Sequence, residues 1–333
     1  MNPQRLQHIL DAAASKRLLV LGDLMLDEFV WGNVGRISPE APVPIVEVQR
    51  ESSYPGGAAN VARNLRGFTS SVTMLGIRGA DAAGEKLAAL LVEEGISGEG
   101  IFTDFSAPTI VKTRIIAQRQ QVVRVDREKQ TASGSSRADI LEKARSLVLT
   151  SDAVLFEDYG KGFLDQTFVD AVLDAARSHG TLVTCDPNPK NPLEWPGIAT
   201  VKPNRAEAFM AAGIPLTPPV HPAEKDTPLL EVGKILLKRW NAGAVLITLS
   251  DQGMMLFRQD APAYHTPTRA REIYDVSGAG DTVISLYTIS LAAGATPLEA
   301  AEIANHAAGI VVGKLGTATC SRRELEESFL GNR

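Results

Sequence analysis

Short, uniformly apolar runs alternate with longer stretches of helical periodicity along most of this chain. Five such runs stand out, at 17–23, 71–79, 152–158, 181–188 and 244–250. Runs of this length and composition are typical of strands that are buried on both faces. Strand–helix alternation therefore predicts an α/β fold, with a mainly parallel central sheet and helices on both of its faces.

Helical periodicity is clearest in three stretches, 84–95, 165–180 and 229–243. The last two close on Gly180 and Gly243, and we expect both glycines to cap the C-termini of their helices. The Pro and Gly content of 52–57 (SSYPGG) and of 213–228 predicts loops there.

Two segments, 31–50 and 109–127, break the strand–helix alternation. Polar and apolar side chains alternate in the second, which has neither Gly nor Pro, and the first is rich in Pro and β-branched residues. Such alternation is typical of antiparallel strands with one solvated face. We predict a small inserted β-sheet that forms a lid, made of about 31–53 and 105–128, within one domain that spans 1–333.

Charge and cysteine content exclude several classes of protein. The chain has 34 Lys and Arg against 39 Asp and Glu, a net charge of −5, which gives no general attraction to nucleic acid or anionic membranes. Cys185 and Cys320 are too few for a disulfide framework, and we expect buried thiols in a reducing compartment. No apolar leader begins the chain, and the longest uncharged stretch, 282–298, is too short to span a bilayer. We expect a soluble, cytoplasmic protein with neither nucleic-acid nor membrane partners.

The strongest local signal is DVSGAGDT at 275–282, directly before a long apolar helix. The small residues Gly278, Ala279 and Gly280 leave backbone N–H groups open to a ligand, and a helix N-terminus attracts anions. Asp281 would lie in the first turn, where a carboxylate can act as a general base. An ordinary helix start, with glycines that only turn the chain, fits the same residues.

A second motif, PGGAAN at 55–60, opens another predicted helix. Gly56 and Gly57 would allow a ligand to approach the backbone closely, and the Asn60 amide offers a donor and an acceptor that suit a polyol. A glycine-rich helix start with small packing residues is the alternative. Phosphate-binding P-loops, dinucleotide-binding GxGxxG motifs, protein-kinase signatures and HxxxH metal spacing are all absent from the sequence.

Together these motifs resemble the two signatures of the PfkB family of ribokinase-like carbohydrate kinases. Other pieces follow the order of that family: Asp27 after the first strand, an N-x-x-E motif at 204–207, a strand and turn at 248–253, and Asn305 on a late helix. The resemblance covers about 17–320 and implies the ribokinase-like fold.

Within that family, segments 22–48 and 112–128 resemble the D-glycero-β-D-manno-heptose 7-phosphate kinases, in which RISPEAPVP and a QQ-containing strand recur. Many bacterial versions carry a nucleotidylyltransferase domain after the kinase, and we expect the stand-alone form here. Ser277 replaces the Thr of many relatives, and both residues carry a hydroxyl. The implied reaction is transfer of phosphate from ATP to O1 of the heptose 7-phosphate, which yields the 1,7-bisphosphate used for ADP-heptose and the lipopolysaccharide core.

The resemblance also implies a role for individual residues. Asp281 would accept the proton of the sugar hydroxyl, while the amides of Gly278, Ala279 and Gly280 hold the transferred phosphoryl group. The sugar would contact Asp27, Gly56, Gly57 and Asn60. The nucleotide would contact Asn204, Glu207, Ser250, Gly253 and Asn305. Glu207 would hold Mg²⁺ through water, because Mg²⁺ keeps much of its hydration shell. The implied cofactors are ATP and Mg²⁺, and a monovalent cation is an open alternative.

The distal phosphate of the sugar needs a local cation, since the net charge of the chain is negative. Lys190 is the first candidate because it follows a predicted strand end, where open α/β sheets bind ligands. Arg119 and Arg124 are further candidates on the lid, together with Arg78, Lys112 and Arg114. A solvated surface charge is the alternative for each.

A lid of this kind would exclude water from the reaction, and in the resembled family such lids often pair two subunits, which implies a homodimer. Two other functions stay open. One is a kinase of the same family that acts on fructose phosphate, ribose or adenosine. The other is a non-catalytic sugar-binding regulator, which the retained Asp281 argues against because a pure binder needs no base.

Overall fold

The computed structural model describes residues 1–118, 120–129, 137–270, 274–314 and 316–331. The strands are β1 (Arg17–Gly22), β2 (Leu24–Ile37), β3 (Pro44–Gly57), β4 (Ser71–Gly79), β5 (Ser97–Asp104), β6 (Ile110–Ala117), β7 (Gln120–Arg127), β8 (Ala153–Glu157), β9 (Leu182–Asp186), β10 (Thr200–Val201), β11 (Ala244–Thr248), β12 (Met254–Arg258) and β13 (Tyr264–Thr266). The helices are α1 (Pro3–Ala13), α2 (Ala58–Arg66), α3 (Ala82–Glu93), α4 (Arg137–Val148), α5 (Gln166–His179), α6 (Arg205–Ala212), α7 (Thr227–Arg239), α8 (Ala279–Ala292), α9 (Pro297–Val311) and α10 (Arg322–Phe329), with short 3₁₀ turns η1 (Ala223–Lys225) and η2 (Ser250–Gln252).

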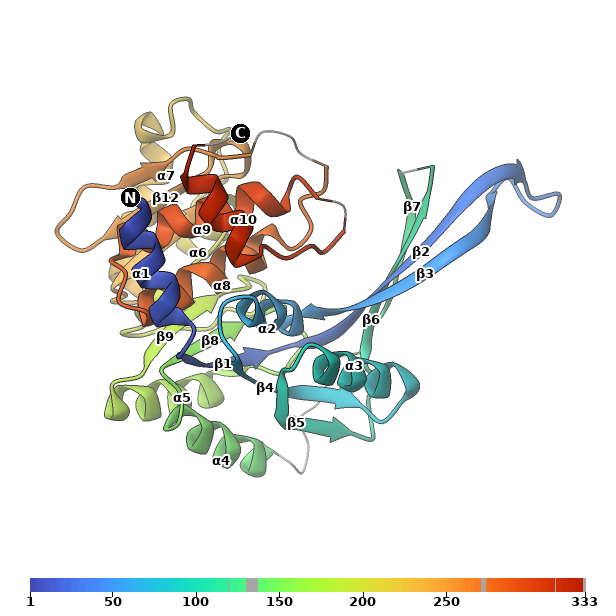
Figure 1. The fold of residues 1–333 in the computed structure, drawn as a ribbon, viewed down its shortest axis with the longest axis horizontal. Helices are drawn as coiled ribbons and strands as arrows, with labels where there is room; N and C mark the ends of the chain where they lie inside the picture. The colour runs from blue at the N-terminus through green and yellow to red at the C-terminus, as the bar shows by residue number, and fades with distance from the viewer. Residues whose placement is uncertain (119, 130–136, 271–273, 315, 332–333) are drawn as a thin grey trace.

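The central sheet has the strand order β13-β12-β11-β10-β9-β8-β1-β4-β5. Its pairs are parallel from β5 to β11, and β12 and β13 pair antiparallel at one end. Alternate side chains of β1 enter different cores: Leu18 and Val20 pack with α1, α2, α3, α8 and α9, whereas Leu19 and Leu21 pack with α4 to α7. The body has therefore three layers, with the sheet between two layers of helices (Figure 1). The predicted α/β fold with a mainly parallel sheet is confirmed.

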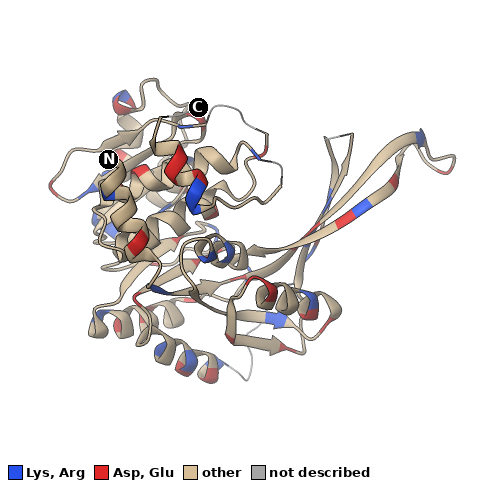
Figure 2. Cartoon of the chain, viewed as in Figure 1, with Lys and Arg blue, Asp and Glu red and all other residues tan. Residues whose placement is uncertain are grey.

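A second sheet, with the order β3-β2-β6-β7, forms an arm that projects from the body (Figure 1). We call this sheet the lid. Its outer pairs are antiparallel, and β2 and β6 pair in parallel. The predicted small inserted sheet is therefore present, although its first hairpin begins at Leu24 rather than near residue 31. Figure 2 shows charges of both signs distributed over the lid and the body.

The prediction of a loop at 52–57 is wrong, because these residues form the end of β3. Tyr54 pairs with Asp27, and Gly56 pairs with Met25. Pro55 is tolerated because β3 is an edge strand, so the missing N–H group need not serve a second neighbour. The proline and glycine content of this segment favours a loop, but its pairing with β2 holds the chain extended.

Of the two predicted glycine caps, one is confirmed. Gly180 ends α5 in the left-handed conformation, with φ of 75°. Gly243 does not end α7, which stops at Arg239 with Trp240 as its cap. Trp240 is buried, and the positive φ that follows belongs to Asn241. The helix ends at Arg239, and the Trp240 ring that follows packs in the core. Gly243 lies in the turn that leads to β11.

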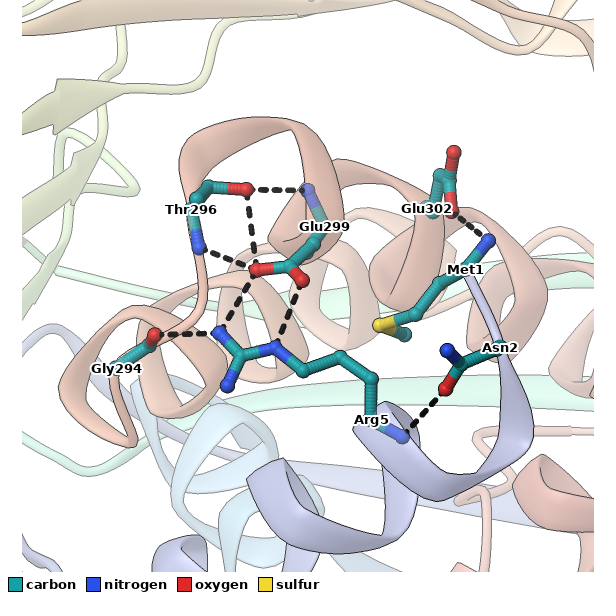
Figure 3. Close-up of polar contacts among 7 residues, drawn as sticks. All are labelled: Met1, Asn2, Arg5, Gly294, Thr296, Glu299 and Glu302. Atoms are coloured by element: carbon teal, nitrogen blue, oxygen red, sulfur yellow. Dashed lines mark hydrogen bonds and ion pairs between the residues drawn. The ribbon is translucent and has the colours of Figure 1, made fainter.

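The N-terminal helix is fastened to α9 by polar contacts (Figure 3). The Arg5 guanidinium donates to both carboxylate oxygens of Glu299, at 2.8 and 3.0 Å, and to the carbonyl of Gly294 at 2.9 Å. The Met1 ammonium lies 2.9 Å from a carboxylate oxygen of Glu302. Glu299 also belongs to a capping box with Thr296. These contacts fix the start of α9, the helix that carries Asn305 into the candidate site.

Asp23 is the single residue between β1 of the body and β2 of the lid. Its buried carboxylate accepts N–H groups of Tyr159, Lys161 and Phe163 at 3.0 to 3.2 Å. Its carbonyl accepts the N–H of Ala58, where the chain leaves the lid, at 3.1 Å. The two ends of the β2–β3 hairpin are therefore tied to the body at one point.

Both cysteines are buried free thiols, as predicted. Among the described residues, no helix combines the length and the apolar character that a membrane span requires.

Candidate active site

Asp281 lies in the first turn of α8, directly after the glycine-containing turn. The side chain is buried, and both of its oxygens accept hydrogen bonds. Asn60 Nδ2 donates to Oδ2 at 2.7 Å, and the Tyr159 hydroxyl donates to Oδ1 at 3.0 Å. The structure thus joins the two motifs, 221 residues apart in sequence, at one carboxylate.

Gly278 precedes α8 in the left-handed conformation, with φ of 78°. A Cβ atom at this position would lie 3.0 Å from Asn60 Nδ2, so a larger residue would strain the backbone and crowd the amide. The Ala279 N–H donates to the carbonyl of Val276 at 3.2 Å, so one of the three predicted phosphate-binding amides already has an acceptor. Gly280 lies beside Lys202, whose Nζ would be 3.4 Å from an added Cβ.

Burial raises the pKa of Asp281, and the hydrogen bonds from Asn60 and Tyr159 oppose this shift, as does the charge of Lys202. The outcome is a carboxylate whose pKa lies above its ordinary value. A raised pKa makes a carboxylate a stronger base, which suits proton acceptance from a hydroxyl group.

Asp27 lies on β2 at the root of the lid, and its buried carboxylate pairs with the guanidinium of Arg114 on β6. Gly56 is its neighbour on β3, where an added Cβ would lie only 2.4 Å from Asp27 Oδ2. Gly57 has φ of 57° and no room for a Cβ beside the carbonyl of Asp23. The lid root therefore presents one carboxylate against a surface kept open by glycines.

Four cations gather around this carboxylate. Lys112 and Arg114 lie on one face of β6, Arg124 lies opposite Arg114 on β7, and Lys161 comes from the loop after β8. Burial lowers the pKa of Lys112, and the charges of Lys161, Arg124 and Arg114 act in the same direction, against the charge of Asp27. We call these four residues the cation cluster.

The cations differ in their anionic partners. Arg114 pairs with Asp27, Arg124 pairs with Asp126 at 2.8 Å, and Lys161 pairs with Glu128 at 2.6 Å. In the part of the chain that the structure describes, Lys112 has no ion-pair partner, and its Nζ lies 5.2 Å from the centre of the Tyr159 ring. A half-buried ammonium group without an anion is a favourable place for an anionic ligand.

Further charged groups lie at the carboxyl ends of three neighbouring strands. Glu157 ends β8 and is buried, Asp186 ends β9, and Lys202 follows β10 and pairs with Asp186 at 2.6 Å. Burial raises the pKa of Asp186 to about 7 against the effect of Lys202. Burial also raises the pKa of Glu157 well above its ordinary value, and its Oε2 atom has no hydrogen-bond partner among the residues that the structure describes.

Asn204 and Glu207 form a capping box at the start of α6. Asn204 Oδ1 accepts the Glu207 N–H at 3.0 Å, and Glu207 Oε2 accepts the Asn204 N–H at 2.8 Å. This arrangement explains the N-x-x-E spacing on structural grounds alone. The charge of Glu207 nevertheless acts on both Asp186 and Lys202, so its carboxylate borders the same group.

This donor set fits Mg²⁺ held mainly by water and phosphate. Glu207 and Asp186 offer the carboxylate oxygens that Mg²⁺ prefers. Asp186 borders Gly280 at the N-terminus of α8, and the charge of Glu207 acts on Asp186. Among the described residues, no group of three or more acidic, histidine or cysteine side chains could hold a metal ion alone. Side chains in this part of the site would thus hold Mg²⁺ through water, and the assignment of this role to Glu207 stays a prediction.

A cavity with mostly apolar walls brings together three of the five residues predicted on the nucleotide side, whereas Asn204 and Glu207 do not line it. Ser250, Gly253, Asn305, Ala279 and Gly280 all line it, beside valine and methionine side chains. Gly253 has φ of 87°, and an added Cβ would meet the carbonyl of Thr266 at 2.1 Å. Asn305 is oriented by its hydrogen bond to the carbonyl of Pro267 at 2.6 Å. The cavity ends at the first turn of α8, next to Asp281.

Three predicted cations have different positions. Lys190 is exposed, its backbone N–H donates to Asn188 Oδ1 at 3.1 Å, and among the described residues no contact joins its side chain to the cation cluster. Arg124 belongs to that cluster. Arg119 lies outside the described residues.

A second cavity, of about 490 Å³, separates the lid from the body. Aromatic and amide side chains line it on the lid side: Phe29, Trp31, Asn33, Gln49, Gln118 and Gln121. Arg114 lies at its inner end, and Asp275 and Ser277, just before α8, lie on the body side. Aromatic faces and amides together suit a ligand with many hydroxyl groups.

Sequence analysis missed Tyr159, Lys161, Lys202 and Asp186 as site residues. Each follows or ends a buried strand of the central sheet, and ligands of open α/β sheets bind at carboxyl strand ends. That rule was applied to Lys190 alone. Applied to every predicted strand, it would have selected these side chains as well.

Comparison with known proteins places these residues in a family. The family described as "pfkB family carbohydrate kinase" matches residues 15–324. The "Bifunctional protein HldE" of Helicobacter hepaticus is 40% identical over 312 residues, which cover 93% of this chain and 63% of that protein. This chain thus spans less than two thirds of the length of that relative.

Solved structures share the fold. A ribokinase from Thermotoga maritima aligns with a TM-score of 0.73 at 20% identity, over 95% of this chain and 100% of the other. Phosphofructokinase-2 from Escherichia coli, in complex with substrates and products, aligns with a TM-score of 0.74 at 20% identity, over 95% and 98% of the two chains. The predicted ribokinase-like fold is confirmed.

Proposed function

This chain belongs to the pfkB family of carbohydrate kinases, and we propose that the sugar it phosphorylates is D-glycero-β-D-manno-heptose 7-phosphate, at O1. Segments 22–48 and 112–128, which resemble the heptose 7-phosphate kinases, form β2, the start of β3, most of β6 and all of β7. The proposal concerns the kinase reaction alone, because the HldE relative extends beyond the length matched here.

In this reaction the sugar binds between Asp27 and Asp281. Asn60 and Tyr159 hold the Asp281 carboxylate, which accepts the proton of the anomeric hydroxyl as that oxygen attacks. The N-terminus of α8, at Gly278 to Gly280, and the nearby Lys202 ammonium stabilise the charge on the transferred phosphoryl group. ATP supplies the phosphoryl group. Glu207 and Asn204 would hold Mg²⁺ through water, and the bound ion would supply positive charge to the phosphates.

The unpaired ammonium of Lys112 carries the proposal. It lies in a cluster of four cations beside the sugar-side carboxylate Asp27, in a chain whose net charge is −5. A neutral sugar gains nothing from such a concentration of positive charge, whereas a sugar phosphate brings nearly two negative charges to it. Charge-assisted hydrogen bonds of this kind contribute about 1.5–3 kcal/mol each, which is roughly ten- to a hundredfold in affinity.

The length of the sugar is the second element of specificity. Asn33, Gln49 and Gln121 line the lid side of the wider cavity, beside Trp31. Their amides can each donate to and accept from hydroxyl groups. A seven-carbon sugar has hydroxyl groups enough to reach this wall while its phosphate stays in the cation cluster.

The test measures ADP release with a panel of acceptors: the heptose 7-phosphate, the same heptose without phosphate, fructose 6-phosphate, ribose and adenosine. We expect the heptose 7-phosphate to have the highest kcat/KM. If fructose phosphate or an unphosphorylated sugar has the highest value, the heptose assignment is wrong. If the protein binds a sugar yet releases no ADP with any of them, it is a sugar-binding regulator.

Variants then locate the phosphate. Lys112→Met keeps the apolar stem and removes the charge, and it should lower kcat/KM roughly ten- to a hundredfold for the phosphorylated heptose only. Lys86→Met is the matched control. The Lys86 Nζ atom lies 3.7 Å from Oε1 of Glu28, on the face of the lid opposite to Asp27, so its loss should not affect the phosphate. If Lys190→Ala abolishes the phosphate preference and Lys112→Met does not, the phosphate binds at Lys190 as first expected.

We also propose that the lid pairs two copies of the chain. Several large apolar side chains are exposed on it: Ile37, Val48, Val123 and Val125, each at 40% exposure or more. A second lid is the partner that would cover them symmetrically. Light scattering should give twice the chain mass, and Val123→Lys together with Val125→Lys should give a monomer. A monomeric wild-type protein at micromolar concentration would contradict the pairing.

A further inference from the structure

The Tyr159 hydroxyl donates a hydrogen bond to Oδ1 of Asp281 at 3.0 Å. Tyr159 lies in the loop after β8, two residues beyond the strand end, and its backbone N–H is tied to the buried carboxylate of Asp23. The loop is therefore held from its backbone, and the ring is placed by that anchor. The hydroxyl reaches the catalytic carboxylate from the side opposite Asn60, which occupies Oδ2.

The direction of this hydrogen bond is determined by the surroundings. Burial raises the pKa of Tyr159 well above its ordinary value, and the negative charges of Asp281, Glu157 and Asp186 act in the same direction. The phenol is thus protonated throughout the range of an activity assay and must donate to Asp281. A donor on each oxygen leaves the carboxylate little freedom to rotate, and its remaining lone pairs face the site.

The ring of Tyr159 has its own support on the lid side. Lys112 Nζ lies 5.2 Å from the ring centre, a distance at which a cation is attracted to an aromatic face. The phenol thus lies between the cation cluster and the base. The Tyr159 side chain contacts both Lys112 and Asp281.

We propose that Tyr159 is a positioning residue for the general base, whose hydroxyl holds the Asp281 carboxylate in the orientation that accepts the proton of the sugar. The inference rests on the proposed function, since it assigns Asp281 the role of base. It adds a residue outside both sequence motifs of the site, contributed by the loop that follows β8.

The pH dependence of the reaction distinguishes positioning from packing. The groups that face Asp281 and Tyr159 are Asn60 from α2, Lys202 after β10, Asp186 from β9, Glu157 from β8, Asp27 from β2 and Lys112 from β6. The Tyr159 hydrogen bond favours the charged form of Asp281. Its removal should therefore raise the pKa of the base and move the acidic limb of the kcat/KM profile to higher pH.

The experiment compares Tyr159→Phe with the wild type, using whichever sugar of the panel the wild type phosphorylates best. The ring and its contact with Lys112 remain in this variant, so we expect a folded protein with an unchanged KM for ATP. Loss of a hydrogen bond to a charged group should lower kcat by roughly tenfold or more. Tyr287→Phe is the matched control, because it removes another buried tyrosine hydroxyl from α8, two turns away from Asp281.

A double-mutant cycle separates action through the base from any other role. In an Asp281→Ala background the hydroxyl has no carboxylate to hold, so adding Tyr159→Phe should change the residual kcat by less than about twofold. Equal losses in both backgrounds, or an acidic limb unmoved from that of the wild type, would overturn the proposal. A change in the KM for sugar with kcat unchanged would also overturn it. The identity of the preferred sugar decides the proposed function separately, because it needs only the wild type.

Discussion

Gly56→Ala is the substitution whose effect on the site can be worked out most directly from the structure. Gly56 pairs with Met25 on the neighbouring strand, and its φ lies outside the left-handed region, so alanine fits its backbone conformation. The added Cβ would lie 2.4 Å from Oδ2 and 2.8 Å from Cγ of Asp27. It would also lie 3.0 Å from Cγ of Met25, a milder contact, so the main effect of the substitution falls on the carboxylate that we expect to bind the sugar.

The size of the effect follows from these distances. Ordinary contact begins at 3.4 Å, so the Asp27 carboxylate must move by about 1 Å. A misplacement of 1 Å in a substrate-positioning group can reduce turnover efficiency by about a hundredfold. Folding should suffer less, within the roughly 1–3 kcal/mol typical of overpacking, because the crowded atoms belong to a side chain that can rotate.

The assay measures ADP release against sugar concentration at saturating ATP, and against ATP concentration at fixed sugar. We expect kcat/KM for sugar to fall about a hundredfold, while the KM for ATP stays unchanged because the nucleotide cavity is separate. Gly35→Ala is the control on the same hairpin, because no atom lies within 4 Å of its added Cβ. A Gly56→Ala enzyme with the sugar kinetics of the wild type would show that Asp27 does not position the sugar.

Three further predictions concern the base, the metal and pH. Asp281→Asn keeps the shape of the side chain and should lower kcat about 10²–10⁴-fold with sugar binding nearly unchanged, and near-normal turnover would remove Asp281 from its role. Glu207→Gln retains an oxygen to cap α6, so it should leave thermal stability intact while raising the Mg²⁺ concentration for half-maximal activity; an unchanged Mg²⁺ titration would contradict the assignment. Burial raises the pKa of Asp158 from 3.8 to about 7, so the folded protein retains a proton that the unfolded chain releases, and stability should fall as pH rises through that window. Thermal unfolding between pH 5 and 8 should show a shallower fall for Asp158→Asn, and equal slopes for the two proteins would refute the reasoning.

Much of the body was predictable because buried parallel strands have a simple pattern. The run at 71–79 became β4 with the same bounds, since every second side chain of such a strand meets one of two apolar layers. The end of β3 was not predictable from composition. Pro55 and Gly56 indicate a turn locally, and only the pairing with β2 keeps them extended.

The residues of the candidate site also divide into those that the sequence predicts and those that it does not. Asp281, Asn60 and Gly278 lie in motifs of small residues, and such motifs can be recognised along the chain. Tyr159 lies in no motif, and its contact with Asp281 spans 122 residues of sequence. Lys112 was one of several candidate cations, and only its position beside the Tyr159 ring distinguishes it from the others. Contacts of this range depend on how the sheet and the lid are placed, which no local pattern encodes.

The double attachment at Asp23 holds the β2–β3 hairpin to the body. The chain enters this hairpin at Asp23 and leaves it at Ala58, and both points are fastened there, by three N–H groups from 159–163 and by the N–H of Ala58. Farther out, the pairing of β2 and β3 slips between Trp31 and Gly32 and again between Val34 and Arg36. Bulges of this kind bend and twist a ribbon where its ladder is interrupted.

We predict that the β2–β3 ribbon bends at these register shifts, within the sheet rather than at its base. Closure over a sugar would curl the outer half of the ribbon, while Asp27 and Gly56, inside the bulges, keep their distance to the body. An enzyme built this way could open its cleft to solvent while the Asp27 carboxylate stays at a fixed distance from Asp281.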